Sequence, residues 1–240
     1  MTSPSASGAA SPSAPASASA PASASASASA ENGFDFALPG TWWLVPVDDP
    51  AVAERSIARA VERAVGRRDE DARLRAELRA KFTDVADRAR TAGAAQVHLC
   101  HEVMPGVPLP ATLTVYWPRL ALRASGETDP GAALRAVLGP PDGDADVTLD
   151  DLPTGPGIRR TRVFTGSAAP DGSAPDVTTV EVDYWLATPG GRVLLLSFAC
   201  GMPLLADQLV ELFDLVVRTT TWRFPAGTTG TGGTAGTGRS

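Results

Sequence analysis

The sequence is poor in the side chains that hold metals and carry out acid–base chemistry, since its 240 residues include only two cysteines and two histidines. A structural zinc site needs about four such ligands at short, regular spacings, so we predict no metal site and no cofactor. The sequence also lacks a nucleophile elbow, a phosphate-binding glycine loop and a dinucleotide fingerprint. We therefore expect a protein that is not an enzyme and has no catalytic, cofactor-binding or metal-binding residues.

The cysteines and histidines are nevertheless close in one place. Cys100 has His101 beside it and His98 two residues before it. Neighbours in a strand point to opposite faces, and side chains two apart are about 6.5 to 7 Å apart, which disfavours a thiol nucleophile here. Cys100 and Cys200 both lie in apolar, strand-like runs. We expect two buried thiols in a reducing compartment, and the alternative is a disulfide between neighbouring strands.

An excess of basic charge is absent, because the formal net charge is −6. This acidic total argues against nucleic-acid binding. The stretch 51–93 is mildly basic, and we interpret its arginines, Arg75 and Arg79 among them, as solvated helix faces; a partner surface is the alternative. Alternating aspartates at 142, 144 and 146 resemble a calcium loop, but no glutamate stands at the twelfth position, so we interpret them as an acidic turn.

Long hydrophobic runs are missing too. No stretch approaches the 18 or so apolar residues of a membrane span, and the first 30 residues lack the basic start and apolar core of a signal peptide. We therefore predict a cytoplasmic protein. A misassigned start codon is the alternative, and it would make the chain exported or tethered to the cell envelope.

Two tails have compositions that cannot form a core. Residues 1–30 are almost wholly alanine, serine and proline, and residues 225–240 are mostly glycine, threonine and alanine. Such segments cannot bury enough apolar surface to offset the entropy of ordering, so we predict that both are disordered. Residues 31–224 are then predicted to form a single α+β domain.

The best-specified part of this domain is its end, residues 177–224. Val180, Val182 and Tyr184 alternate with acidic residues, which predicts a half-buried strand before the Pro189-Gly190-Gly191 turn. The apolar run after the turn predicts a central strand with Leu195 fully buried. An amphipathic helix near Pro203 follows, and its Phe213 is expected to pack toward Leu195.

Two long helices are predicted upstream, as a helical hairpin. Asp48 and Asp49 before Pro50 are typical of a helix start, and the first helix is expected to end at Gly66. The second helix is predicted from about Asp69 to Ala92. Its apolar residues recur every three to four positions and are expected to face inward: Leu74, Leu78, Phe82, Val85 and Ala89.

The remaining elements complete a mostly antiparallel sheet. Strands are predicted at 95–103, 112–117, 147–149 and 158–165, and a short helix at 130–138 is predicted to be capped by Asp129. Near the start of the domain, Pro39-Gly40 is expected to turn the chain into a short strand. Of Trp42 and Trp43 in that strand, one is expected to enter the core and the other to lie at an edge or under a helix.

Short motifs at both ends of the domain resemble the PsbP-like superfamily. Phe36-Ala37-Leu38-Pro39-Gly40-Thr41-Trp42 is similar to a strand that ends in a Leu-Pro-x-x-Trp corner, and the closing strand and helix of 193–224 are similar as well. The resemblance implies an α/β/α sandwich with a mostly antiparallel sheet flanked by helices. It also implies a binding or accessory module, because such proteins share a fold while binding different partners and share no catalytic residues.

From these observations we expect a non-enzymatic accessory module that binds another protein. The first alternative is a small-ligand carrier or enzyme with a cleft between the sheet and the helical hairpin. The second is a secretion- or envelope-associated component that is tethered by the N-terminal tail. The abundance of alanine, glycine and arginine, with Lys81 as the sole lysine, indicates a high-GC bacterium such as an actinobacterium.

Overall fold

A computed structural model describes residues 33–140, 146–167 and 176–223 of the chain, without the side chains of 146–151 and 167. The two tails predicted to be disordered lie outside these ranges, as do Asp142 and Asp144 of the predicted acidic turn. The described residues contain no helix that is long and apolar enough to cross a membrane.

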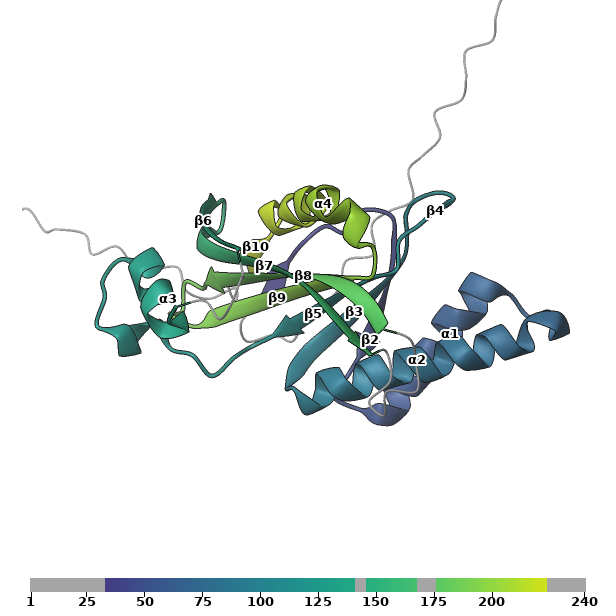
Figure 1. The fold of residues 1–240 in the computed structure, drawn as a ribbon. Helices are drawn as coiled ribbons and strands as arrows, with labels where there is room; N and C mark the ends of the chain where they lie inside the picture. Colours follow the sequence, from purple (N-terminus) through teal and green to yellow (C-terminus); the bar gives the residue numbers. More distant parts are fainter. Residues whose placement is uncertain (1–32, 141–145, 168–175, 224–240) are drawn as a thin grey trace, which may run out of the picture.

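The described residues form four α-helices and ten strands (Figure 1). The α-helices are α1 (Pro50–Val65), α2 (Ala72–Thr91), α3 (Pro130–Leu138) and α4 (Ala206–Arg218). Short 3-10 turns lie at Asp69–Asp71, Leu122–Ser125 and Pro203–Leu205. The strands are β1 (Gly33–Asp35), β2 (Thr41–Pro46), β3 (Ala94–Met104), β4 (Val107–Pro108), β5 (Ala111–Tyr116), β6 (Asp146–Leu152), β7 (Gly155–Ser167), β8 (Asp176–Ala187), β9 (Val193–Cys200) and β10 (Thr221–Arg223).

The strands build one large antiparallel sheet and one small ribbon. The large sheet has the order β2-β3-β5-β9-β8-β7-β6, with β4 paired to β3, and the ribbon joins β1 to β10. The predicted α+β class with a mostly antiparallel sheet is therefore confirmed. Sequence signals fix the helix ends as predicted: Asp49 caps α1 through its side chain, Gly66 ends α1, and Asp129 caps α3.

Helices cover both faces of the sheet. Along β8, Val182 and Tyr184 point into the core beneath α4, whereas Trp185 and Ala187 point to the other face and pack with α3. The strand register places Leu99, which packs against α1 and α2, on the same face as Trp185. The sheet therefore lies between α4 on one side and the hairpin with α3 on the other (Figure 1).

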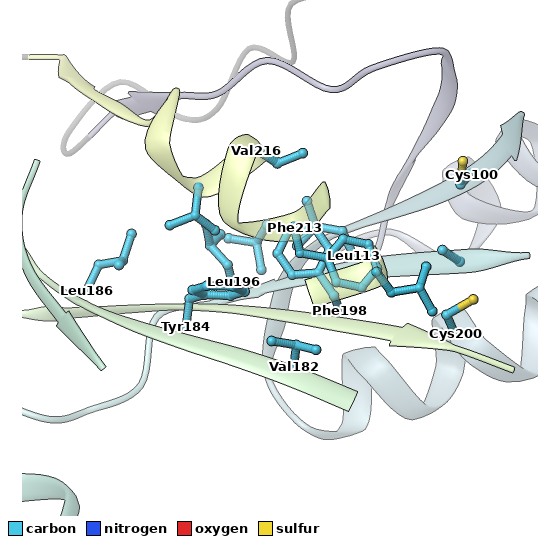
Figure 2. Close-up of a cluster of buried hydrophobic side chains, with 14 of the residues drawn as sticks. Cys100, Leu113, Val182, Tyr184, Leu186, Leu196, Phe198, Cys200, Phe213 and Val216 are labelled. Atoms are coloured by element: carbon cyan, nitrogen blue, oxygen red, sulfur yellow. The ribbon is translucent and has the colours of Figure 1, made fainter. Parts of the chain in front are cut away.

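Aromatic side chains fill the core between the sheet and α4. Phe213 of α4 stacks on Phe198 of β9 with ring centroids 4.3 Å apart, and Tyr184 meets Phe198 edge-on at 5.7 Å (Figure 2). Phe198 and Phe213 are both fully buried. Aromatic pairs in this geometry contribute about 0.5 to 1.5 kcal/mol beyond the apolar area that they bury. The last helix therefore packs on the central strand β9 through Phe213 as predicted, but its contact is Phe198, and the expected packing toward Leu195 is wrong.

The expectation that Leu195 is fully buried is wrong. Leu195 is half-buried and belongs to none of the three buried clusters of described residues. Its neighbours Leu194 and Leu196 belong to the cluster that contains Phe213. Side chains alternate along a strand, so Leu195 points away from α4 to a part of the opposite face where burial is incomplete. The uniformly apolar sequence Leu194-Leu195-Leu196 concealed this alternation.

The two cysteines are free and buried. Strand β5 lies between the strands that carry Cys100 and Cys200, so the two backbones are about 9 to 10 Å apart. A disulfide requires Cα atoms within about 7 Å, which excludes the alternative of a bridge. The expectation of two buried thiols is confirmed.

The Pro-Gly corner before β2 is closed by two contacts. The indole nitrogen of Trp42 donates a hydrogen bond of 2.8 Å to the carbonyl oxygen of Pro39. Gly40 has φ of +77°, and a Cβ there would lie 2.1 Å from the carbonyl oxygen of Glu102 on β3. Only glycine fits this position, so the Leu-Pro-x-x-Trp pattern has a structural explanation: it seats the corner against the neighbouring strand.

Candidate binding cleft

The closed end of the helical hairpin extends past the sheet (Figure 1). The buried residues of both helices lie toward the open end of the hairpin: Ala53, Ile57, Ala60, Val61, Ala86 and Ala89. The apolar stripe of α2 does not all face inward as predicted, because Leu74 is 47% exposed and Leu78 and Phe82 are half-buried. Leu78, Phe82 and Val85 do pack against the buried cluster of α1, α2 and β3, so the predicted inward face is correct for them, and Leu74 is the member of the stripe that is exposed.

A cleft of about 750 Å³ lies between the hairpin and the sheet. Its helical wall includes Val65, Leu78 and Phe82, and its floor on β2 and β3 includes Trp43, Leu99 and His101. Residues 108–110 and Met202 also line it. Pockets that bind small molecules or side chains of partners have volumes of about 300 to 1,000 Å³ and a mainly apolar lining, so this cleft is large enough to hold a ligand.

The cleft carries few polar groups. His101 stacks on Trp43 with ring centroids 4.9 Å apart and an angle of 19° between the planes. Lys81 is exposed in the helical wall, and the half-buried Thr112 contributes to the floor. Trp43 is the tryptophan that lies under the helices, whereas Trp42 packs against the core below α4. The expectation that the two indoles lie on opposite faces is confirmed.

Exposed apolar side chains surround the same end of the sheet. We define the apolar rim as Met104, Val107, Val177, Leu204 and Leu205, each at least 40% exposed. Met104 ends β3, Val107 begins β4 and Val177 lies at the start of β8, and Leu204 and Leu205 lie in the 3-10 turn after β9. Leu204 is 96% exposed, two residues beyond Met202 in the cleft. Apolar side chains gathered in this way mark interaction surfaces.

The histidines and Cys100 are separated as the strand pattern predicted. His101 faces the cleft and His98 faces the core beneath α4, whereas Cys100 borders the cleft but is buried as a member of the core cluster beneath α4. His98 is 2% exposed, its ring contacts Phe36 edge-on, and its Nε2 lies 3.2 Å from Gln96 Oε1. Burial lowers the pKa of His98 to about 4 and raises the pKa of Cys100 to about 12. A nucleophilic cysteine needs a lowered pKa, so the direction of this shift disfavours a nucleophilic role for Cys100.

Two arginines of β7 pair with acidic residues of β8. Arg160 on β7 donates to Asp183 on β8 at 3.0 Å, and Arg162 bonds Glu181 in the next row of the sheet. Burial raises the pKa of Glu181, and the neighbouring Asp183 adds to this effect. Among the described residues, no three histidine, cysteine, aspartate or glutamate side chains gather as metal ligands would.

Sequence reasoning placed the cleft between sheet and hairpin but missed its main apolar wall. Leu78 and Phe82 were assigned to the core, against which they do pack, but they are only half-buried and also line the cleft, because periodicity shows that a helix has an apolar face and does not show how completely it is covered. The rim was also missed, since its members come from strand ends and a turn that are far apart in the sequence. The basic composition of 51–93 was the remaining signal that this hairpin differs from an ordinary core element.

Comparisons with known proteins leave the family open. No protein-family model matches the sequence, and no curated protein matches it. Among solved structures, the chain is similar to the crystal structure of LpqN, which is involved in cell envelope biogenesis of Mycobacterium tuberculosis. The identity is 11%, the match covers 80% of this chain and 84% of that chain, and the TM-score is 0.37. A similarity this weak carries no argument about function, and the resemblance to the PsbP-like superfamily stays a prediction.

Proposed function

We propose that this chain is a non-enzymatic accessory module that binds another protein, and that the cleft receives an apolar segment of that partner. The observation that supports it is the apolar rim at the sheet edge next to the cleft, where Leu204 lies two residues beyond Met202 of the cleft lining. A small ligand would need the cleft alone, whereas the rim extends the apolar surface past it to Leu204. Interfaces place aromatic and aliphatic anchors in pockets and surround them with further contact area.

The absence of an enzymatic role belongs to the same proposal. The cleft holds one histidine, and its imidazole is stacked on Trp43. The nearest thiol, that of Cys100, is buried and has a strongly raised pKa. The acidic pair Glu181 and Asp183 is held by arginines on the adjacent strand. None of these arrangements supplies an activated nucleophile next to a general base.

Site-specific photocrosslinking in the source organism tests the proposal. A photoreactive phenylalanine analogue would replace Leu78 in the cleft, Leu204 on the rim, and Leu215, a control on α4 that is 64% exposed. We expect the same partner protein to be linked at positions 78 and 204 and not at 215. Equal linking at all three positions, or none, would contradict the proposal.

A matched pair of charge substitutions adds an independent readout. Leu204→Glu places a charge on the rim without disturbing the core, because the side chain is almost fully exposed. We expect it to weaken the linking at position 78, whereas Leu215→Glu leaves it unchanged. Both variants should melt within about 2 °C of the parent, as exposed substitutions rarely cost more than about 0.5 kcal/mol.

The second candidate function is a small-ligand carrier, and the volume of the cleft favours it. A cavity of about 750 Å³ matches the size of cavities that hold single small molecules. Native mass spectrometry of the protein purified from its source separates the two candidates. A carrier would retain a small molecule that Phe82→Trp displaces by filling the cleft, and a protein-binding module would show the mass of the bare chain.

A further inference from the structure

A second groove lies on the other side of α1, along the edge of the sheet. It has a volume of about 500 Å³ and runs between α1 and β2, the terminal strand of the large sheet. Trp42, Leu44 and Pro46 line it from the strand. The hydroxyl of Ser56 on α1 donates a hydrogen bond of 2.9 Å to the carbonyl oxygen of Leu44, which fixes the helix beside this edge.

Three arginines line the groove from the helix. Arg55, Arg59 and Arg63 are spaced four residues apart, so they lie on one face of α1 with a rise of about 6 Å from each to the next. All three side chains are exposed. Within the described residues, none of them has an ion pair or a side-chain hydrogen bond. The groove therefore has a line of three positive charges that the described side chains leave unpaired.

The two acidic residues of α1 do not line the groove. Glu62 is paired with Arg67 at 2.7 Å, and this bond, together with the charges of Arg67, Arg79 and Arg75, lowers the pKa of its carboxyl group. Glu54 borders the hollow between α1 and α2. The helix thus separates its charges, with acidic side chains toward α2 and arginines toward the edge of the sheet. This separation gives the groove a positive field of its own, although the whole chain carries a net charge of −6.

We propose that this groove binds an extended acidic segment of a partner protein, with carboxylates at alternate positions. Side chains on one face of an extended chain recur every 6.6 to 6.8 Å or so, close to the roughly 6 Å rise between successive arginines. Each carboxylate can therefore meet one guanidinium group, a pairing that arginine favours. Ser56 already bonds the carbonyl group of Leu44 at the edge of the sheet, so the segment does not bind by adding a strand to β2. The arginines recognise it instead.

This site is separate from the cleft, since the two lie on different sides of α1 and share only Trp43 among their lining residues. The proposal does not depend on the function assigned to the cleft. A partner could use either surface alone, or it could place an apolar segment in one and an acidic segment in the other.

The test measures fluorescence anisotropy of a labelled synthetic peptide with the full-length chain. The peptide has about seven residues with glutamate and threonine in alternation, long enough to span all three arginines. We expect binding that weakens at least about tenfold in the Arg55→Gln/Arg59→Gln/Arg63→Gln variant and that falls as salt screens the charges. A control variant, Arg73→Gln/Arg88→Gln/Arg218→Gln, removes the same charge elsewhere and should keep the affinity of the parent chain.

Three results would overturn the proposal. The first is no binding by the parent chain, and the second is an equal loss in the two triple variants, which would indicate a general charge effect. The third is tighter binding of an oligothymidylate of matched charge, which would assign the groove to nucleic acid. A peptide of the same composition with its glutamates in one block should bind more weakly than the alternating one, and equal binding would contradict the spacing argument. If the site variant melted early, Arg59→Gln alone would replace it.

Discussion

Tyr184 and Asp214 connect the sheet to the last helix through a hydrogen bond of 2.6 Å, donated by the hydroxyl group to one carboxylate oxygen. The other carboxylate oxygen accepts from Arg159 Nη1, also at 2.6 Å. Asp214 lies on α4, whereas Tyr184 and Arg159 lie on neighbouring strands of the sheet. One carboxylate at the margin of the aromatic core therefore fixes the position of α4 over two strands.

Removing this carboxylate should destabilise the fold. Asp214→Ala leaves the Tyr184 hydroxyl and the Arg159 guanidinium without this acceptor, and we expect a loss of about 2 to 3 kcal/mol. Asp214→Asn keeps an acceptor for Tyr184 and should lose less. Urea denaturation measures both, with Glu211→Ala on the exposed side of α4 as the control. A loss for Asp214→Ala no greater than that of the control would show that packing alone positions α4.

The buried His98 should make stability depend on pH. Its pKa is about 4 in the folded protein and about 6.5 when unfolded, so between these values the unfolded chain binds one more proton. Stability is therefore fully present above about pH 6.5 and falls as the pH drops toward 4, by up to about 3 kcal/mol from this group. His98→Gln cannot titrate, so its stability should fall less over this range. If the urea midpoints of the parent chain and of His98→Gln fell equally from pH 7 to pH 4, His98 would be excluded as the cause of the pH dependence.

The two faces of β9 should respond differently to truncation. Phe213→Ala removes a fully buried ring stacked on Phe198, and we expect a loss of about 3 to 5 kcal/mol. Leu195→Ala should cost only about 1 kcal/mol, because Leu195 is half-buried on the other face. Chemical denaturation of both variants decides this, and an equal loss would mean that the face near Leu195 is covered after all.

These differences show which features the sequence determines locally. Helix starts and ends were predictable because Asp49, Gly66 and Asp129 act through bonds and angles within a few residues. The corner at Gly40 was predictable as a turn, although its contact with Glu102 joins positions 62 apart in the chain. Burial of Leu195 and Phe82 was not predictable, since it depends on how far a helix placed elsewhere extends over the sheet.

The candidate cleft follows the same logic. A cleft between sheet and hairpin could be offered as an alternative from the order of elements in the sequence alone. A long hairpin packs against the sheet and is longer than the sheet that it covers. The residues that line the cleft could not be predicted, since Met202 enters it from a loop about 120 residues after Leu78. The groove with Arg55 was concealed for another reason: acidic residues are interspersed among the arginines of 51–93, and only the helix geometry shows which arginines line the groove.

The tip of the hairpin should depend on Arg75, which the sequence presented as an ordinary surface residue. Its Nη1 atom donates to the carbonyl oxygens of Gly66 at 3.1 Å and of Arg68 at 2.7 Å, so α2 holds the turn that follows α1. Arg75→Ala should cost about 1 kcal/mol, above the 0.5 kcal/mol or so of a surface site, and should speed amide exchange in 66–72. Arg79→Ala, one turn along on an exposed position, should do neither. Hydrogen exchange read by mass spectrometry checks both variants. If Arg75→Ala left exchange in 66–72 unchanged, helix packing alone would hold the tip, and the wall of the cleft would not depend on this side chain.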